Sequence, residues 1–353
     1  MPNGIELKVK GKIEPKEVII EKIETYEKKL MPPAPLVTDM LLTLTSTLYG
    51  ISSNETMKEA QRLFELGLVT YIRTDSTRVS DAGLWVGKRL VEDLFGSNQH
   101  VTRRWERGGE GAHECIRPTR PLTLEDLKEA IESGEIVLQE ELSGKALNIY
   151  DLILRVFIAS QMKEVIGTFA NITFRIVDEE SKKDLLVEVS GLVEYDREGF
   201  PLALTSFMRK ILLPKRIPLV RPGERYSKAE IKVNYEKVPS AWPLTEGEIV
   251  RLMREKGIGR PSTYATIIQK LFERRYIRRI QHGRIVPKKR GIIVNRIIEA
   301  LHKDMVSEER TRIIHEEIDE VASGKKDYAD AVSYTHLRAH ETRHDLVCRL
   351  LLE

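Results

Sequence analysis

Tyr71 and Arg73 are the residues of this 353-residue chain whose types and spacing point most directly to chemistry. They lie in "LVTYIRT", a stretch rich in residues that favour β structure, so it is expected to be extended. Side chains alternate along an extended segment, which puts Tyr71, Arg73 and Asp75 on one side. A guanidinium beside a phenol favours the phenolate and stabilises charge on a phosphate oxygen under attack. The pattern predicts covalent catalysis on a phosphate ester, although a lone pair of this kind is usually an ordinary surface feature.

The element that must hold this stretch is a helix immediately before it. Ser52 and Glu55 have the spacing of a capping box, and Gly67 suits the end of the helix. Between these points the apolar residues recur at helical spacing, namely Met57, Ala60, Leu63 and Phe64. The tyrosine is therefore predicted to follow an amphipathic helix directly.

The chain is expected to fold as several domains. An opening region alternates like a strand around Ile5 to Val9 and is broken by the prolines of "MPPAPLVTD". A mostly helical region follows, and then "NITFRIVDEESKKDLLVEVSGLVEYD" and "AEIKVNYEKV" indicate β segments. Helices resume at the capping-box pair Thr245 and Glu248. The predicted segments are 1–35, 36–162, 163–240, 241–330 and 331–353.

The region from Arg251 to Arg290 is strongly cationic. It holds thirteen lysines and arginines against two glutamates, in a chain whose net charge is only +3. Such a patch is typical of a surface that binds a polyanion, most often nucleic acid. A solvated basic surface without a partner is the alternative.

Within that patch, "GRPSTY" is expected to open a helix. Pro261, Ser262 and Thr263 open a helix whose free backbone N–H groups can hold a phosphate, and Arg260 precedes this helix start. Tyr264 either stacks on a base or sits in the core. A hairpin around Gly283 follows and completes a winged-helix outline. A basic helical hairpin that only packs on its neighbours is the other interpretation.

Composition excludes several classes of protein. No stretch approaches the roughly 20 apolar residues of a membrane span, and the charged N-terminus is not typical of a signal peptide, so we expect a cytoplasmic protein without a membrane partner. The two cysteines, Cys115 and Cys348, form no C-x-x-C pair and predict neither a disulfide framework nor a thiolate zinc site. Many Lys, Arg and Glu residues with few Gln suggest a protein that works at high temperature.

The string "GLVTYIRTDSTRVS" resembles the active-site segment of type IA DNA topoisomerases. "EGAHECIRPTRPL", "YDLILRVFIASQM" and "EKGIGRPSTYATIIQKLFERRYI" resemble further segments of that family, in the same order. The resemblance implies that Tyr71 attacks single-stranded DNA to form a 5′-phosphotyrosine, that Arg73 stabilises the transition state, and that His113 contacts the phosphate and handles a proton. The DNA-binding residues implied are Asp75, Thr77, Arg117, Arg260, Ser262, Thr263 and Tyr264.

The resemblance also implies a fold, which is multidomain with mixed α and β structure. Residues 36–162 would form a helical, winged-helix-like tyrosine domain, and residues 163–240 a β hinge that begins with the segment 1–35. Residues 241–330 would form a helical, winged-helix-like base that binds DNA. Together these domains would make up part of a toroidal arch.

Within the family, "PPAPLVTDMLL", "RRWERGGEGAHECIRPTRPL" and "SEERTRIIHEEIDEVASGKKDY" look most like the topoisomerase half of reverse gyrase. That resemblance implies ATP-dependent positive supercoiling in the full enzyme. The family's Toprim domain, with its catalytic glutamate and D-x-D carboxylates, has no match here, and neither a G-x-x-x-x-G-K-[ST] motif nor a zinc finger is visible. Mg²⁺ ligands are therefore expected in the missing Toprim domain, and ATP and Zn²⁺ only in the full-length enzyme.

The chain is accordingly expected to be an internal fragment that binds single-stranded DNA but cleaves it poorly, with the Toprim and helicase domains as its partners. Other type IA enzymes, of the topoisomerase I or III kind, remain an alternative. A non-catalytic single-stranded DNA-binding module and a tyrosine recombinase are others.

The last residues, 331–353, are expected to be a non-native tail. His336, His340 and His344 stand four residues apart, which on a helix would suggest a metal site. The stretch instead resembles a translated sequencing adaptor, so it is excluded from the fold and no metal ligand is expected in this chain.

Overall fold

The structure is a computed structural model that describes residues 6–9, 12–105, 113–138, 140–179, 184–234, 242–301 and 307–329. It divides into two compact units, and helices α1 (Thr38–Tyr49) and α2 (Ser53–Glu65) each contribute to both. The first unit comprises residues 1–41 and 56–242, and the second comprises residues 42–55 and 243–353. The tail histidines of the sequence prediction lie outside the described residues.

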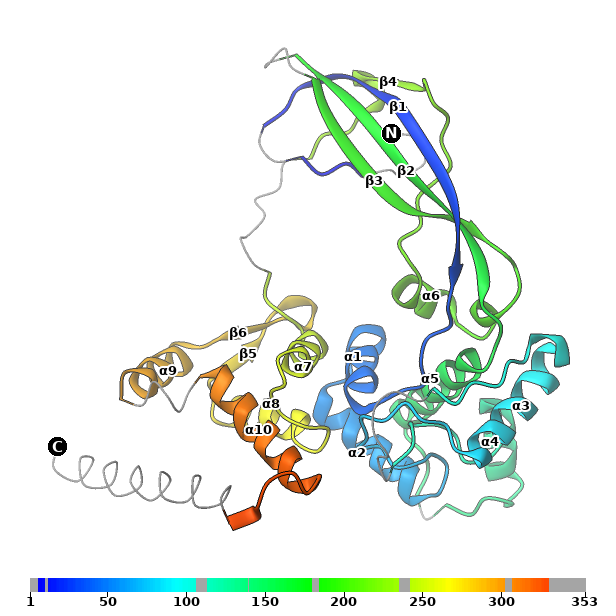
Figure 1. The fold of residues 1–353 in the computed structure, drawn as a ribbon, viewed down its shortest axis with the longest axis vertical. Helices are drawn as coiled ribbons and strands as arrows, with labels where there is room; N and C mark the ends of the chain where they lie inside the picture. The colour runs from blue at the N-terminus through cyan, green and yellow to red at the C-terminus, as the bar shows by residue number, and fades with distance from the viewer. Residues whose placement is uncertain are drawn as a thin grey trace. The chain divides into compact units, whose positions relative to one another are not determined.

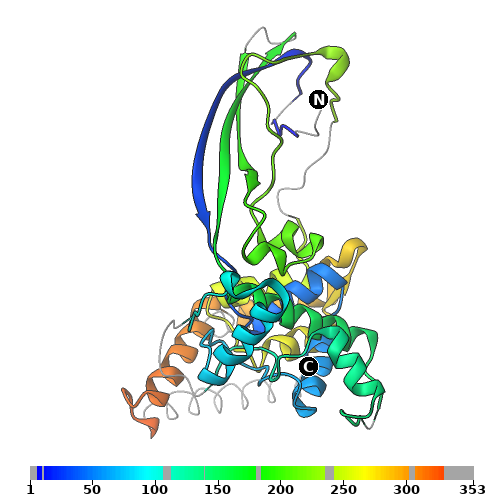
Figure 2. The same ribbon diagram turned by 90° about the vertical axis from the view of Figure 1, so that its right-hand side faces the viewer.

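An antiparallel sheet forms one part of the first unit. Its strands β1 (Pro15–Leu30), β2 (Val165–Asp178), β3 (Asp184–Tyr195) and β4 (Arg225–Ser227) lie in the order β3-β2-β1-β4. Figures 1 and 2 show β1 and β2 running side by side for their whole length. Their pairing extends from Pro15 opposite Asp178 to Leu30 opposite Val165, with register shifts between Pro15 and Glu17 and between Ile20 and Lys22. Ile217 and Val220, from the chain between β3 and β4, join side chains of the sheet, including Tyr226 of β4, in one hydrophobic core.

Two sequence predictions about these strands differ from the structure. The first strand begins at Pro15, and residues 6–9, where alternation was expected, form no regular element. The described part of "AEIKVNYEKV" contains no strand. It begins within a short 3₁₀ helix, η4 (Lys228–Glu230), and continues without regular structure. Alternation in the sequence is not sufficient to make a strand: among the described residues, the long pairings join β1 to β2 and β2 to β3.

The helices of the first unit gather around one buried helix, α5 (Gly144–Ser160), whose fully buried side chains include Tyr150 and Phe157. Helix α3 (Asp81–Phe95) approaches it at Gly87, where an added Cβ would come within 2.8 Å of the Gln161 side chain. The unit also contains α4 (Leu124–Glu132), α6 (Ser206–Leu212) and the 3₁₀ helices η2 (Ser97–Gln99) and η3 (Phe200–Leu202).

The second unit consists of helices and a short hairpin. The helices are α7 (Glu246–Glu255), α8 (Tyr264–Glu273), α9 (Lys289–Leu301) and α10 (Glu308–Ala322), and the hairpin pairs β5 (Ile277–Arg279) with β6 (Ile285–Pro287). The predicted capping box of Thr245 and Glu248 is present, and the turn of the hairpin, η5 (Gln281–Gly283), ends at Gly283 as expected. The winged-helix assignment and the domain boundaries stay predictions.

No helix among the described residues is long and apolar enough to cross a membrane.

Candidate functional site

The Tyr71 segment begins where helix α2 ends. Ser52 and Glu55 make the hydrogen bonds of the predicted capping box, and Gly67 ends the helical region with a φ of +69°. The segment is not a strand, since only Val69 makes an isolated bridge, to Pro118. Hydrogen bonds to residues distant in the sequence, rather than to a neighbouring strand, hold this segment in an irregular conformation.

The expected alternation of side chains is nevertheless present. Ile72 and Thr74 are buried, with 0% and 2% of their surfaces exposed. Arg73 and Asp75 are exposed, and Tyr71 is partly exposed. Tyr71, Arg73 and Asp75 therefore share the solvent side of the segment.

A second segment, residues 113–119, is fastened to the first through Thr70. The Thr70 hydroxyl donates to the Cys115 carbonyl at 2.7 Å and accepts a bond from the Arg117 N–H at 3.0 Å. The backbone N–H of Thr70 donates to the Arg117 carbonyl at 2.9 Å. One residue before Tyr71 thus fixes the chain that carries His113.

The rings of Tyr71 and His113 are in contact as a result. Their centroids are 4.9 Å apart with an angle of 39° between the planes, and His113 is exposed. On the helix side, Phe64 meets Tyr71 edge to face at 5.5 Å, which restrains the phenol ring. An exposed imidazole therefore lies against a partly exposed phenol.

Arg73 is available to a ligand. Its side chain forms no ion pair or hydrogen bond with any residue in the described part of the chain, and it is exposed. A guanidinium in this state can bind a phosphate through two parallel hydrogen bonds.

Arg117, in contrast, points into the protein and is only 4% exposed. Its guanidinium donates to both carboxylate oxygens of Glu114, at 2.9 and 2.8 Å, and also to the Pro118 carbonyl and the Ser80 hydroxyl. Burial by itself raises the pKa of Glu114, but the hydrogen bonds from Arg117 and Ser80 outweigh it and hold the pKa below its ordinary value. A direct contact of Arg117 with DNA stays a prediction, and in this structure the side chain braces the loop that carries His113.

The other predicted contacts of this unit differ in their surroundings. Asp75 is exposed, whereas the hydroxyl of Thr77 donates to the Trp105 carbonyl at 2.8 Å. That bond ties the segment after Tyr71 to the chain that precedes residues 106–112, which lie outside the description. A DNA contact at Asp75 or Thr77 stays a prediction.

The second unit holds the other group of predicted DNA contacts. Helix α8 begins at Tyr264, three residues later than expected, because the N–H groups of Thr263 and Tyr264 both donate to the Arg260 carbonyl and close a turn. The N–H of Thr263 is therefore not free for a phosphate. Tyr264 is 5% exposed, which places it in the core rather than on a surface where a base could stack.

Arg260 is held by α10. Its guanidinium donates to Asp319 at 2.5 Å and to the His315 carbonyl at 3.2 Å. Burial, followed by the charge of Arg260, lowers the pKa of His315. A pocket of about 300 Å³ opens beside this contact, and its polar lining residues are Ser262, Thr263, Thr266, Lys270, Thr311 and His315.

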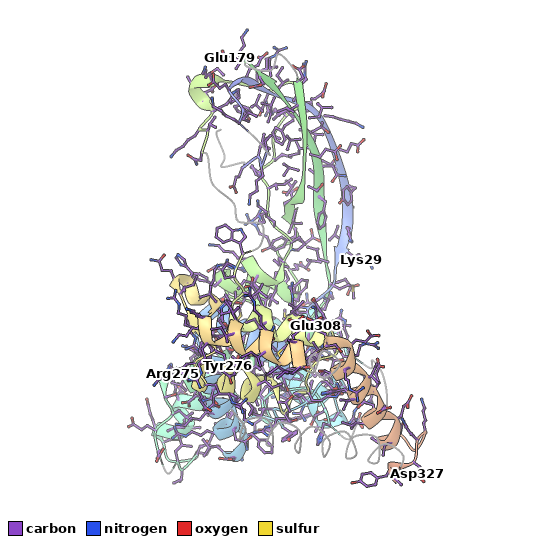
Figure 3. The ribbon with its side chains drawn as sticks, turned by 90° about the vertical axis from the view of Figure 1, so that its left-hand side faces the viewer. Lys29, Glu179, Arg275, Tyr276, Glu308 and Asp327 are labelled. Atoms are coloured by element: carbon purple, nitrogen blue, oxygen red, sulfur yellow. The ribbon has the colours of Figure 1, made fainter. Side chains whose placement is uncertain are left out.

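Several cations of α8 and the hairpin remain unpaired, while others do not. Arg279 is bonded to the buried carboxylate of Glu246, and Lys256 to Glu308, which is labelled in Figure 3. Arg275, also labelled there, has a φ of +60° at the turn into β5. The exposed cations that make no ion pair with a described residue include Lys270, Arg274, Arg275 and Arg278.

No group of three or more His, Cys, Asp or Glu side chains within the described part of the chain is arranged to hold a metal ion.

Comparisons with known proteins agree on one family. A family model described as DNA topoisomerase matches residues 6–333. Reverse gyrase 1 of Aquifex aeolicus is 38% identical over 328 residues, which cover 92% of this chain and 27% of that protein. Reverse gyrase of Pyrococcus furiosus is 35% identical over 318 residues, which cover 90% of this chain and 25% of that protein. The chain thus spans about a quarter of the length of these relatives.

Among solved structures, full-length topoisomerase I of Thermotoga maritima matches with a TM-score of 0.70 at 27% identity. The match covers 95% of this chain and 56% of that one.

Proposed function

The chain belongs to the type IA DNA topoisomerase family, and on that premise we propose that it supplies the tyrosine with which such an enzyme opens one DNA strand. The observation that carries the proposal is the contact between Tyr71 and His113, 4.9 Å between ring centres. Arg73, which makes no ion pair with a described residue, lies on the same side of the segment as Tyr71. Both rings come from segments that resemble family motifs, and Thr70 holds those segments together.

In the proposed reaction, the Tyr71 hydroxyl oxygen attacks a phosphorus atom of single-stranded DNA and loses its proton. A bond forms between that oxygen and phosphorus, and the bond from phosphorus to the 3′ oxygen breaks. The leaving 3′ oxygen takes up a proton, which leaves a 5′-phosphotyrosine. Attack by the 3′ hydroxyl reverses every step and rejoins the strand.

The roles of the neighbouring side chains follow from their placement. Arg73, exposed and unpaired, is suited to neutralise charge on the phosphate oxygens as it develops. His113 is suited to contact the phosphate and to pass a proton to or from the reacting oxygens. The exposed cations of α8 and the hairpin are suited to bind the DNA backbone.

We further propose that the parent enzyme is a reverse gyrase, which couples strand passage to ATP and changes the topology of DNA by positive supercoiling. The identity of 38% to such a protein supports this assignment, as does the heat-adapted composition. A topoisomerase I is the second candidate, because a solved structure of that name shares the fold. We propose that the full-length parent enzyme carries the Toprim and helicase domains, uses ATP and Zn²⁺, and is cytoplasmic.

The Mg²⁺ ligands of the family are proposed to lie in the Toprim domain, whose catalytic glutamate and D-x-D carboxylates have no match in this sequence. The steps above use this chain's own side chains alone.

The test is covalent capture of DNA. The chain is incubated with a labelled single-stranded oligonucleotide, Mg²⁺ and a separate polypeptide that carries the family's metal-binding carboxylates, and adducts are separated under denaturing conditions. We expect an adduct that Tyr71→Phe abolishes without loss of DNA binding. Tyr26→Phe, at another partly exposed tyrosine, is the control and should leave the adduct unchanged. DNA binding by the wild type without any adduct above the background seen with Tyr71→Phe would favour a DNA-binding module without catalysis.

A further inference from the structure

The hydroxyl of Thr38 is buried against the backbone that carries Arg73. We propose that Thr38 is a positioning residue for strand cleavage, whose hydroxyl fixes the chain on both sides of Arg73 and so presents Tyr71 and Arg73 together. The inference rests on the proposed function for its consequence, but its structural basis is independent of that function.

Three polar groups of the Tyr71 segment meet this one side chain. The Thr38 hydroxyl lies 2.7 Å from the Ile72 carbonyl and 3.0 Å from the Thr74 carbonyl, and it accepts a bond from the Thr74 N–H at 2.9 Å. The backbone N–H of Thr38 also donates to the Thr74 carbonyl, at 2.9 Å. Arg73 is the residue between these contacts.

A hydroxyl suits this place because it donates and accepts at once. Its single proton can go to only one carbonyl at a time, and its lone pairs take the Thr74 N–H. Thr38 is 0% exposed and Thr74 is 2% exposed, so water cannot replace the hydroxyl. Buried backbone groups that lose such a partner drive the chain to rearrange.

The contacts are not those of an ordinary helix start. Thr38 is the first residue of α1, where a capping threonine would accept a bond from an N–H two or three residues along its own helix. Its hydroxyl instead reaches residues 34 and 36 positions away. Thr45 in the same helix, also 0% exposed, shows the local pattern, because its hydroxyl donates to the Leu42 carbonyl.

The arrangement explains how an irregular segment keeps alternating side chains. With Ile72 and Thr74 turned inward and their backbone held by Thr38, Tyr71 and Arg73 must face outward. A displacement of about 1 Å in a reacting group can lower a rate on the order of 100-fold. Loss of the hydroxyl should therefore affect the chemical step more than the affinity for DNA.

The experiment uses Thr38→Val, which keeps the side-chain shape, and Thr38→Ser, which restores the hydroxyl. Thr45→Val is the matched control. The complemented reaction is the one that contains Mg²⁺ and the separate polypeptide with the metal-binding carboxylates. In it, Thr38→Val should form the adduct about 100-fold more slowly in a single turnover at saturating oligonucleotide, with unchanged DNA affinity. Thr38→Ser and Thr45→Val should remain within a few-fold of the wild type. A wild-type rate in Thr38→Val, or an equal loss in Thr45→Val, would overturn the proposal.

Hydrogen exchange separates this inference from the proposed function. The Thr74 amide should exchange about tenfold faster in Thr38→Val, because it loses its acceptor, and at the wild-type rate in Thr38→Ser. A wild type that forms no adduct on Tyr71 overturns the proposed function. Unchanged exchange of Thr74 in Thr38→Val overturns the role of Thr38, whatever the wild type does.

Discussion

Replacing Glu114 by glutamine removes the negative charge that balances a guanidinium almost without access to water. The side chain of Arg117 is 5% exposed and that of Glu114 is 22% exposed, and two of the four hydrogen bonds of the guanidinium end on this carboxylate. Glutamine has nearly the same shape but brings one oxygen and an NH₂ group that faces the cation. The variant therefore leaves a buried positive charge without its partner.

The expected loss of unfolding free energy is about 3 kcal/mol, the low end of the range for breaking one side of a buried ion pair, because Glu114 keeps some contact with water. For a unit of about 230 residues this corresponds to a fall of about 6–12 °C in Tm. Asp93→Asn is the control, because Asp93 pairs with Arg89 at 3.5 Å on the exposed face of α3. An exposed pair at this spacing contributes about 0.3–0.5 kcal/mol.

The pH dependence gives a second, independent readout. The pKa of Glu114 is lower in the folded chain than in the unfolded one, so its ionised form stabilises the fold above the unfolded value of about 4.3. That contribution is lost as pH falls through the folded pKa. The difference in stability between the wild type and Glu114→Gln should therefore be full near neutral pH and shrink below about pH 4.3.

Thermal and denaturant unfolding of the two variants and the wild type, between pH 3 and pH 7, is the assay. If Glu114→Gln unfolds within about 1 kcal/mol of the wild type at neutral pH, or its deficit grows as the solution is acidified, the ion pair does not brace the His113 loop as described.

Three further predictions concern the chemistry, the DNA-binding surface and the packing. Arg73→Ala should slow adduct formation in the complemented reaction by at least about 100-fold with little change in DNA affinity, and a weaker affinity at an unchanged rate would contradict the transition-state role. Lys270, Arg274, Arg275 and Arg278 are the exposed cations expected to bind the DNA backbone. Neutralising one of them should reduce the magnitude of the slope of log affinity against log salt for single-stranded DNA by about 0.7, and neutralising all four should reduce it by about 3. Lys256→Gln, whose charge is paired with Glu308, is the comparison, and an unchanged slope would place the DNA elsewhere. Gly87→Ala should lower the free energy of unfolding, measured by chemical denaturation, by about 1–3 kcal/mol because its Cβ would crowd Gln161. Gly144→Ala is the control and should not destabilise, since no atom lies within 4 Å of its added Cβ. Equal results for the two variants would show that α3 and α5 are not closely packed.

Several local features of the fold could be predicted from short sequence patterns. The capping boxes at Ser52 and Thr245, the helix end at Gly67 and the hairpin around Gly283 all depend on residues within a few positions of one another, and all are present. The order of the family motifs likewise pointed to the family that the comparisons identify.

Features set by distant partners were not predictable. The segment after α2 looks like a strand, but its backbone bonds go to Thr38 and to residues 115–117, so it stays irregular. A DNA contact of Arg117 stays a prediction, and its ion pair with Glu114, three residues earlier, was not part of the sequence prediction. The i,i+3 spacing of Glu114 and Arg117 is a local signal that could have suggested this ion pair.

The positioning threonines were also missed. Thr38 and Thr70 both lie in segments that resemble the family. The sequence does not show which distant carbonyl a threonine hydroxyl will bond to, so these contacts could not be predicted. Tyr264 was left undecided between core and surface because a tyrosine in a helix suits either, and its 5% exposure decides for the core.

The most direct test of the account is to identify the amino acid bonded to DNA. After cleavage of a single-stranded oligonucleotide in the complemented reaction, protease digestion and mass spectrometry should find one modified peptide, with a nucleotide attached through its 5′ phosphate to Tyr71. Attachment through a 3′ phosphate, or at any residue other than Tyr71, would contradict the account.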